Sequence, residues 1–190
     1  MAEDFGAVLK QHGVILEGHF LLTSGRHSGF YFEKFRILEH PELCKIFARQ
    51  IADKFRKDRI TVVCGPTTGG VIIAYEVARQ LGCRCIIAER TDNGRRIGRG
   101  FHIDEKDRVL VVDDVMTTGS SILQTLEALE QFPATVAGIA VFIDRNGGKG
   151  LDTPYFAVYE QRVEDYEPEN CPLCKAGVPL QVPGRSGKTS

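Results

Sequence analysis

Two adjacent acids, Asp113 and Asp114, stand between an apolar run and a turn rich in hydroxyl side chains. The run Val109–Val112 is typical of a strand buried on both faces, where unpaired carboxylates are costly. The turn Thr117–Ser121 contains Gly119 and opens a segment with apolar residues at helical spacing. A helix that begins there would direct free N–H groups and the positive end of its dipole at an anion. This order of strand, acids, turn and helix predicts a phosphate site with carboxylates beside it.

The two acids repel phosphate, so they should bind something next to it. Ribose hydroxyls or a hydrated divalent cation are oxygen partners that suit carboxylates. An ordinary strand-to-helix turn with a helix cap would use the same residue types for structure alone. A nucleotide hydrolase would place an acid here behind a Walker A loop. The fragment Gly187–Thr189 does not supply that loop, because Val182 stands where its first glycine is required.

Composition restricts the class of protein. The 190 residues are enough for one domain with a full core and few for two. A net charge of −1 argues against a nucleic-acid partner, and no stretch approaches the roughly 20 apolar residues of a membrane helix. The start, Met1–Leu9, includes acids and lacks the pattern of a signal peptide. We therefore expect a cytoplasmic protein with small-molecule ligands, no nucleic-acid partner and no membrane partner.

Helical and strand patterns alternate around the acid pair. Strands separated by single helices form right-handed crossovers and a parallel sheet, whose ligands bind beyond the carboxyl ends of the strands. The predicted fold class is therefore α/β, with a parallel sheet flanked by helices. Helices are expected at 41–57, at 69–81 and after Ser121, strands at 60–64, 85–88, 109–112, 135–143 and 155–159, and ligand-binding loops at 65–70, 89–101, 113–121 and 144–150.

Two of these loops have residues that suit a polyphosphate. The glycines of Gly65–Gly70 allow close approach of the backbone, so that Thr67, Thr68, Gly69 and Gly70 would present N–H groups to pyrophosphate; turn formation alone is the alternative. The segment Glu89–Phe101 is typical of a mobile flap that carries cations, with a solvated loop as the alternative. Its arginines are Arg90, Arg95, Arg96 and Arg99, of which Arg90 and Arg99 are expected to be catalytic.

Two further segments suit a flat, charged ligand. Arg145 follows a predicted strand, and its planar guanidinium matches a carboxylate or imide edge, although a salt bridge with Asp144 would use it equally. The N-terminal Gly18–Phe32 combines glycine turns with aromatic residues, as a hood over a ring would. A plain hairpin with core aromatics is the alternative.

These motifs together resemble the type I phosphoribosyltransferases, which use phosphoribosyl pyrophosphate (PRPP). The segment Ser24–Phe32 is similar to that of the orotate phosphoribosyltransferase family, and the resemblance spans residues 5 to about 180. It differs from many bacterial members at Thr23 and Gly69, where those carry lysines, and in a flap without Lys and His. The C-terminal Cys171-Pro172-Leu173-Cys174 is similar to one branch of the family.

The resemblance implies formation of orotidine 5′-monophosphate and pyrophosphate from orotate and PRPP, in pyrimidine biosynthesis. It implies Mg²⁺ held through PRPP without direct protein ligands, and a homodimer with shared active sites. A phosphoribosyltransferase for a purine or another base, or a non-catalytic PRPP-sensing regulator, is the alternative. Asp113 and Asp114 would bind the ribose, and the 5′-phosphate would contact Val115, Met116, Thr117, Thr118, Gly119, Ser120 and Ser121. Orotate would contact Thr117, Arg145, Ser24, Gly25, Arg26, Tyr31 and Phe32.

The pair Cys171 and Cys174 is half of a zinc site, because zinc needs two more ligands. Cys83 and Cys85, on one face of a predicted strand, are the other clustered cysteines; reduced thiols or a disulfide are the alternatives. We expect a chain organised as a hood over the base site (1–40), a PRPP-binding core (41–165), a Cys-x-x-Cys segment (166–181) and a disordered tail (182–190).

Overall fold

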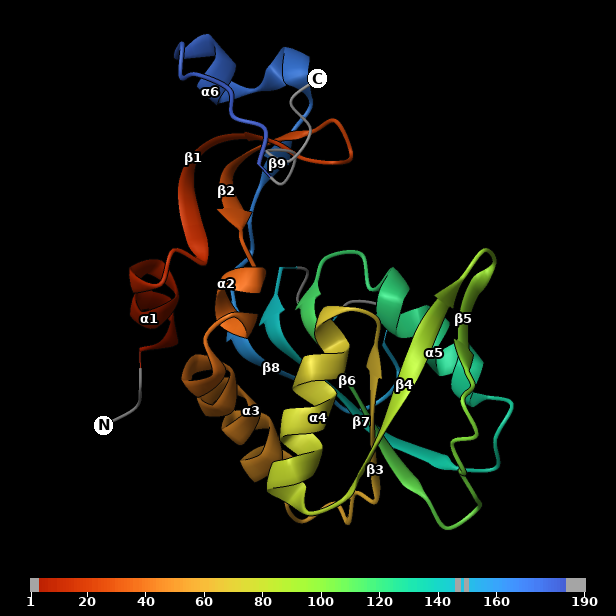
Figure 1. Cartoon of the computed structure of the whole chain (residues 1–190). Coiled ribbons are helices and arrows are strands. Elements are labelled where there is room, and N and C mark those ends of the chain that lie inside the picture. Colours follow the sequence, from red (N-terminus) through yellow and green to blue (C-terminus); the bar gives the residue numbers. More distant parts are fainter. Residues whose placement is uncertain (1–3, 146–147, 149–150, 184–190) are drawn as a thin grey trace. The chain divides into compact units, whose positions relative to one another are not determined.

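The computed structural model describes residues 4–145, 148 and 151–183, and these fall into two compact units (Figure 1). The central unit is His40–Gln161, and the terminal unit combines Met1–Glu39 with Arg162–Ser190. The Cys-x-x-Cys segment therefore belongs to the same unit as the N-terminal segment. Most of the tail expected to be disordered, residues 184–190, lies outside the described residues.

In the described part of the central unit, six strands form a sheet in the order β5-β4-β3-β6-β7-β8. The unit has the predicted α/β architecture with one difference: β5 runs antiparallel to β4, so the sheet is mixed rather than fully parallel. The loop between Thr91 and Gly94 contains two residues, a length that joins antiparallel strands but not parallel ones. The strands are β3 (Val62–Pro66), β4 (Arg84–Thr91), β5 (Gly94–Ile97), β6 (Arg108–Met116), β7 (Thr135–Asp144) and β8 (Tyr155–Glu160).

Helices cover both faces of this sheet. Successive side chains of a strand point to opposite faces, and the strands carry apolar residues on both, so each face needs a covering helix. Val109 and Val111 of β6 share a buried cluster with Ile122 of α5. On the other face Phe47 of α3 packs against Phe142 of β7, with ring centroids 5.3 Å apart. The helices are α3 (Pro41–Phe55), α4 (Gly69–Leu81) and α5 (Ser120–Leu129), and α3 and α4 lie side by side (Figure 1).

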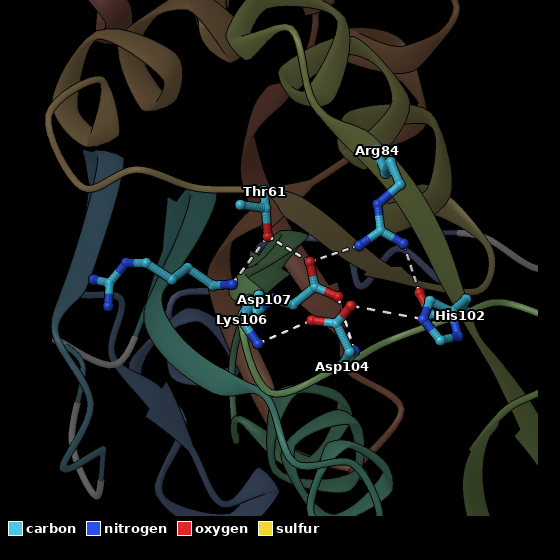
Figure 2. A network of polar contacts seen from close by, with 7 residues as sticks. Thr61, Arg84, His102, Asp104, Lys106 and Asp107 are labelled. Atoms are coloured by element: carbon cyan, nitrogen blue, oxygen red, sulfur yellow. Dashed lines mark hydrogen bonds and ion pairs between the residues drawn. The ribbon is translucent and has the colours of Figure 1, made fainter.

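A buried carboxylate, that of Asp107, ties together the amino ends of three parallel strands (Figure 2). It accepts hydrogen bonds from Thr61 Oγ1 at 2.7 Å, from Arg84 Nη2 at 2.6 Å and from the Asp104 backbone N–H at 2.9 Å. Burial by itself would raise the pKa of Asp107, but these hydrogen bonds and the charge of Arg84 lower it to about 2. The network stabilises the edge of the sheet opposite the carboxyl ends of the strands.

The terminal unit has a small sheet in which the described strands follow the order β1-β2-β9. Its apolar core includes Leu9, Val14, Phe20, Phe32 and Ile37. Across the described residues of both units, no helix combines the length and the apolar character needed to span a membrane. The elements are α1 (Phe5–Gln11), β1 (Ile15–Leu21), β2 (His27–Phe32), α2 (Phe35–Leu38), β9 (Asp165–Tyr166), the 3₁₀ helix η1 (Pro168–Asn170) and α6 (Pro172–Lys175).

Candidate active site

The acid pair lies inside β6 rather than after it. The predicted strand ended at Val112, whereas the ladder with β7 continues through the pairs Asp113–Val141 and Met116–Asp144. The prediction stopped too early because acids are rare in buried strands, yet Asp113 and Asp114 are 7% and 3% exposed. Their position at the carboxyl end of a central strand is where an α/β sheet binds ligands.

Backbone N–H groups bind one oxygen of each acid. The Asp114 N–H donates to Asp113 Oδ1 at 2.8 Å, and the Val115 N–H donates to Asp114 Oδ1 at 2.7 Å. As neighbours on a strand, the two side chains point toward opposite faces. The acids therefore flank the strand end instead of projecting together from one face.

The turn after β6 has the geometry expected of an anion site. Gly119 has φ +78°, a conformation that favours glycine, and α5 begins at Ser120, earlier than the expected start after Ser121. Thr117, Thr118 and Ser120 are exposed. The first N–H groups of α5 have no partner in the helix ladder by construction, so they and the helix dipole favour an anion at this end.

The loop between β3 and α4 needs its glycines for close packing. A Cβ on Gly65 would lie 2.1 Å from the Gly70 carbonyl oxygen, and a Cβ on Gly70 would lie 2.6 Å from Pro66 and 3.1 Å from Asp113 Oδ1. The glycines therefore bring this loop against the acid pair. Thr68 is exposed in the loop, and Gly69 and Gly70 are buried in the first turn of α4.

Arg95 of β5 connects the two phosphate-site loops. Its Nη1 donates to the Thr67 carbonyl oxygen at 3.3 Å and to the Ala88 carbonyl oxygen at 3.1 Å, while its Nη2 donates to Ser121 Oγ at 2.8 Å. Burial lowers the pKa of Arg95, and the nearby Asp113 carboxylate acts in the opposite direction. A cation half-buried beside both loops adds positive potential where polyphosphate would bind.

The other arginines of the expected flap lie differently. Part of this segment is the β4–β5 hairpin, so it is less of a loop than the sequence indicates. Arg90 and Arg96 are exposed, and the Arg90 backbone N–H donates to Thr67 Oγ1 at 3.1 Å. Arg99, expected to be catalytic, forms a salt bridge of 2.6 Å with Glu89. Of these four arginines, Arg95 therefore makes the side-chain contacts with the β3–α4 loop and with Ser121. The sequence did not distinguish Arg95 from the other three.

The residues expected to bind the base lie in both units. In the central unit, Arg145 follows β7, and its backbone N–H donates to the Met116 carbonyl oxygen at 3.0 Å, next to the phosphate turn. In the terminal unit, Ser24 and Gly25 form an exposed turn between β1 and β2. The guanidinium of Arg26 binds the side chain and the carbonyl oxygen of Asp165, and also the Glu167 carboxylate.

The two aromatic residues expected at the base site differ in burial. Phe32 is 7% exposed and belongs to the core of the terminal unit. Tyr31 is half-buried, with its ring centroid 5.8 Å from that of Phe20. Adjacent residues of a strand point in opposite directions, so the two rings do not share a face.

Cys171 and Cys174 belong to the terminal unit, whereas Cys83 and Cys85 belong to the central unit. The described side chains within ligating distance of Cys171 and Cys174 are His19 and His27. In the sequence, Cys83 and Cys85 stood out as the other clustered cysteines, and that choice left out histidine as a zinc ligand. The signal that it missed is that both histidines belong to the N-terminal hairpin, which returns to the C-terminal segment in space.

Comparison with known proteins gives consistent matches. Residues 35–170 match the model of the phosphoribosyl transferase domain. The chain is 46% identical over 172 residues to the orotate phosphoribosyltransferase of Caldanaerobacter subterraneus subsp. tengcongensis, covering 90% of each chain. It is 45% identical to that of Chlorobaculum parvum, covering 94% of this chain and 93% of the relative. The crystal structure of orotate phosphoribosyltransferase from Aeropyrum pernix is similar with a TM-score of 0.72, at 29% identity, covering 82% of this chain and 93% of that one.

Proposed function

The chain belongs to the orotate phosphoribosyltransferases of the phosphoribosyl transferase family, and we propose that the carboxyl ends of β3, β4 and β6 carry its PRPP site. As a pentosyltransferase of pyrimidine biosynthesis, it joins orotate to the ribose of PRPP and releases pyrophosphate. The main support for this site is that the acid pair at the end of β6, the turn at Gly119 and the first turn of α5 follow one another directly in the chain.

The reaction is a displacement at the anomeric carbon of the ribose. A ring nitrogen of orotate loses its proton to water and forms a bond to this carbon, and the bond from the carbon to the pyrophosphate oxygen breaks. Positive charge develops on the ribose and negative charge on the leaving group, so the site must position the sugar and stabilise an anion. Asp113 and Asp114 hold the ribose hydroxyls through their carboxylate oxygens, and they favour the developing positive charge.

The phosphate groups of PRPP are held at two loops. The 5′-phosphate lies at the turn Val115–Ser121, where it accepts hydrogen bonds from backbone N–H groups and from exposed hydroxyls. Pyrophosphate lies at Thr67–Gly70. Arg95 is placed to stabilise both, because it contacts Thr67 and Ser121, and the exposed Arg90 and Arg96, with Arg99, supply further charge on closure.

Magnesium fits this donor set. Carboxylates and hydroxyls are the oxygen ligands that hard divalent cations prefer, directly or through water. Asp113 and Asp114 would bind water molecules of a Mg²⁺ ion that PRPP itself coordinates. When bound, Mg²⁺ would neutralise charge on pyrophosphate, which makes it a better leaving group.

Orotate recognition falls to Arg145 and Thr117 of the central unit. The guanidinium of Arg145 suits a two-point contact with the ring carboxylate or the imide edge. For Ser24, Gly25, Arg26 and Tyr31 of the terminal unit, a role toward orotate rests on the family resemblance alone. Phe32 supports this region from the core, and Arg26 orients it through Asp165 and Glu167.

A steady-state assay of orotate loss with PRPP and Mg²⁺ tests the function. Orotate should be consumed with release of pyrophosphate, while adenine, hypoxanthine and uracil in the same assay should turn over much more slowly. PRPP binding without turnover of any base would overturn the proposal in favour of a PRPP sensor. Preferred use of a purine would overturn the choice of acceptor.

We also propose a cytoplasmic homodimer whose active sites are shared. Exposed flap arginines can reach a neighbouring subunit, and unpaired cysteines suit a reducing compartment. Mixing an Asp113→Asn/Asp114→Asn variant with an Arg90→Ala/Arg96→Ala/Arg99→Ala variant should then restore part of the activity in hybrid dimers. If activity stays absent after subunit exchange has been verified, the flap serves its own chain.

A further inference from the structure

Four side chains of the terminal unit direct metal-ligating atoms at one point. The ligand atoms of His19, His27, Cys171 and Cys174 all lie within 4.8 Å of one another. His19 Nε2 lies 2.9 Å from His27 Nδ1, 3.5 Å from Cys171 Sγ and 3.7 Å from Cys174 Sγ, and His27 Nδ1 lies 3.3 Å from Cys174 Sγ. Zinc bonds of about 2.0–2.3 Å in a tetrahedron give ligand separations of about 3.3–3.8 Å, a range that includes the three distances to sulfur, while the two histidine nitrogens lie closer together. We propose that these residues form a structural zinc site.

The hairpin places both histidines on one face. His27 pairs with Leu21, and His19 lies two residues before Leu21 on the same strand. The register of β1 shifts between Glu17 and Phe20, which places one extra residue opposite β2 and redirects the side chains there. As a result His19 and His27 are 1% and 6% exposed, with ring centroids 4.8 Å apart.

The protonation of His19 favours a ligand. Its Nδ1 lies 2.7 Å from the Val178 carbonyl oxygen, which can only accept a hydrogen bond, so Nδ1 must carry the proton. In the neutral ring, Nε2 then offers a lone pair toward the two sulfurs and His27. A backbone carbonyl that orients the far nitrogen of a histidine in this way is typical of metal ligands.

The C-terminal segment supplies the thiols at the spacing that zinc sites use. Cys171 is fully buried and stands directly before α6, and Cys174 lies three residues later, within one helical turn. After α6 the chain reverses at Gly177, with φ +69°, and Gln181 then binds β1 through hydrogen bonds with His19 and Leu21. This return brings Val178 to His19 and both sulfurs to the histidines.

The ligand set favours zinc in a structural role. Two thiolates and two imidazoles suit the borderline-soft Zn²⁺ better than Mg²⁺, which prefers oxygen. Four protein ligands complete a tetrahedron and leave no position for a substrate, unlike a catalytic zinc site. The ion would join segments 152 residues apart in the sequence, as between His19 and Cys171. The proposal does not depend on which base the enzyme uses.

Metal content tests the site directly. The full chain is purified with a cleaved tag that lacks histidines, without chelators, and its zinc is measured by inductively coupled plasma mass spectrometry. Wild type should hold about one zinc per chain, and Cys171→Ser, Cys174→Ser and His27→Ala should each lose most of it. Cys83→Ser and Cys85→Ser are matched controls outside the cluster and should retain zinc.

A second measurement covers variants that fail to fold. Wild type is stripped with a chelator and titrated with Co²⁺, which should give the visible absorption of a tetrahedral ion with thiolate ligands, displaced by Zn²⁺. Zinc should also protect Cys171 and Cys174 from a thiol reagent. The proposal is overturned if wild type holds no zinc and gives no such cobalt spectrum, if the cysteine variants retain full zinc, or if Cys171 and Cys174 form a disulfide in the purified protein.

Discussion

Arg95 Nη2 donates a hydrogen bond of 2.8 Å to Ser121 Oγ, and through it the β4–β5 hairpin is fixed to the first turn of α5. The same guanidinium binds the Thr67 carbonyl oxygen in the β3–α4 loop. One side chain from an edge strand thus joins the two loops proposed to hold the two ends of PRPP.

Arg95→Lys should therefore impair the use of PRPP. Lysine keeps the charge but cannot reach Thr67, Ala88 and Ser121 together, because it lacks the planar fork. We expect kcat/KM for PRPP to fall roughly 10- to 150-fold, equivalent to about 1.5–3 kcal/mol for a hydrogen-bonded charge. Steady-state kinetics measures this, with Arg49→Lys on the exposed surface of α3 as the control outside the site. Equal effects of the two substitutions would contradict the role of Arg95.

Replacing the acid pair should remove activity and preserve the fold. In Asp113→Asn or Asp114→Asn, an amide group replaces one acceptor oxygen that would receive a ribose hydroxyl. Each change should reduce kcat/KM for PRPP by roughly 10- to 150-fold, and the double variant by more. Circular dichroism checks the fold, and Glu127→Gln on α5 serves as a control. Wild-type turnover in the double variant would refute the assignment.

Arg145→Lys should weaken orotate binding selectively. The change keeps the charge and removes the two-point contact, so orotate affinity should fall roughly thirtyfold, or about 2 kcal/mol. PRPP affinity should stay nearly unchanged, because the proposed PRPP contacts lie in the other loops. Isothermal titration with each ligand separates the two effects. If PRPP binding weakens and orotate binding does not, Arg145 belongs to the phosphate side of the site.

The buried Asp107 gives a prediction about stability and pH. Its pKa in the folded protein is about 2, below the ordinary value of 3.8, so the carboxylate stabilises the fold above pH about 4. That contribution, about 2 kcal/mol, is lost as the pH falls through the folded pKa. Asp107→Asn should reduce the free energy of unfolding by at least this amount at pH 7 and by much less near pH 2. Urea denaturation at both values measures it, with the exposed neighbour Glu105→Gln as control.

Much of the fold could be predicted from the sequence because local pattern and tertiary structure agree in the central unit. The buried runs at 109–112 and 135–143 and the stop at Gly82 each have a local cause in hydrophobicity or backbone conformation. The extension of β6 through Asp113 has no local cause in the sequence. It results from the hydrogen-bonded ladder between β6 and β7. The antiparallel β5 was also missed, since an arginine-rich segment resembles a solvated loop.

The candidate site also combines features that the local sequence indicates with features that depend on tertiary contacts. The residue types of the turn Thr117–Ser121 indicate phosphate by themselves, since glycine and hydroxyls before a helix have a local chemical meaning. The role of Arg95 among its neighbouring arginines depends on which side of β5 faces Thr67 and Ser121. The approach of His19 to Cys171 is a contact across 152 residues, and no local pattern encodes it.

The composition of the terminal unit from both halves of the chain has a consequence for folding during synthesis. The β1–β2 hairpin leaves the ribosome before the central unit, while its partners in β9 and α6 are made afterwards. Arg26 precedes Asp165 by 139 positions, which take roughly 7 to 28 s at about 5–20 residues per second. During that interval the central unit, which ends at Gln161, is still being made, and the hairpin waits with its edge strand unpaired, a state in which binding by a chaperone would protect it.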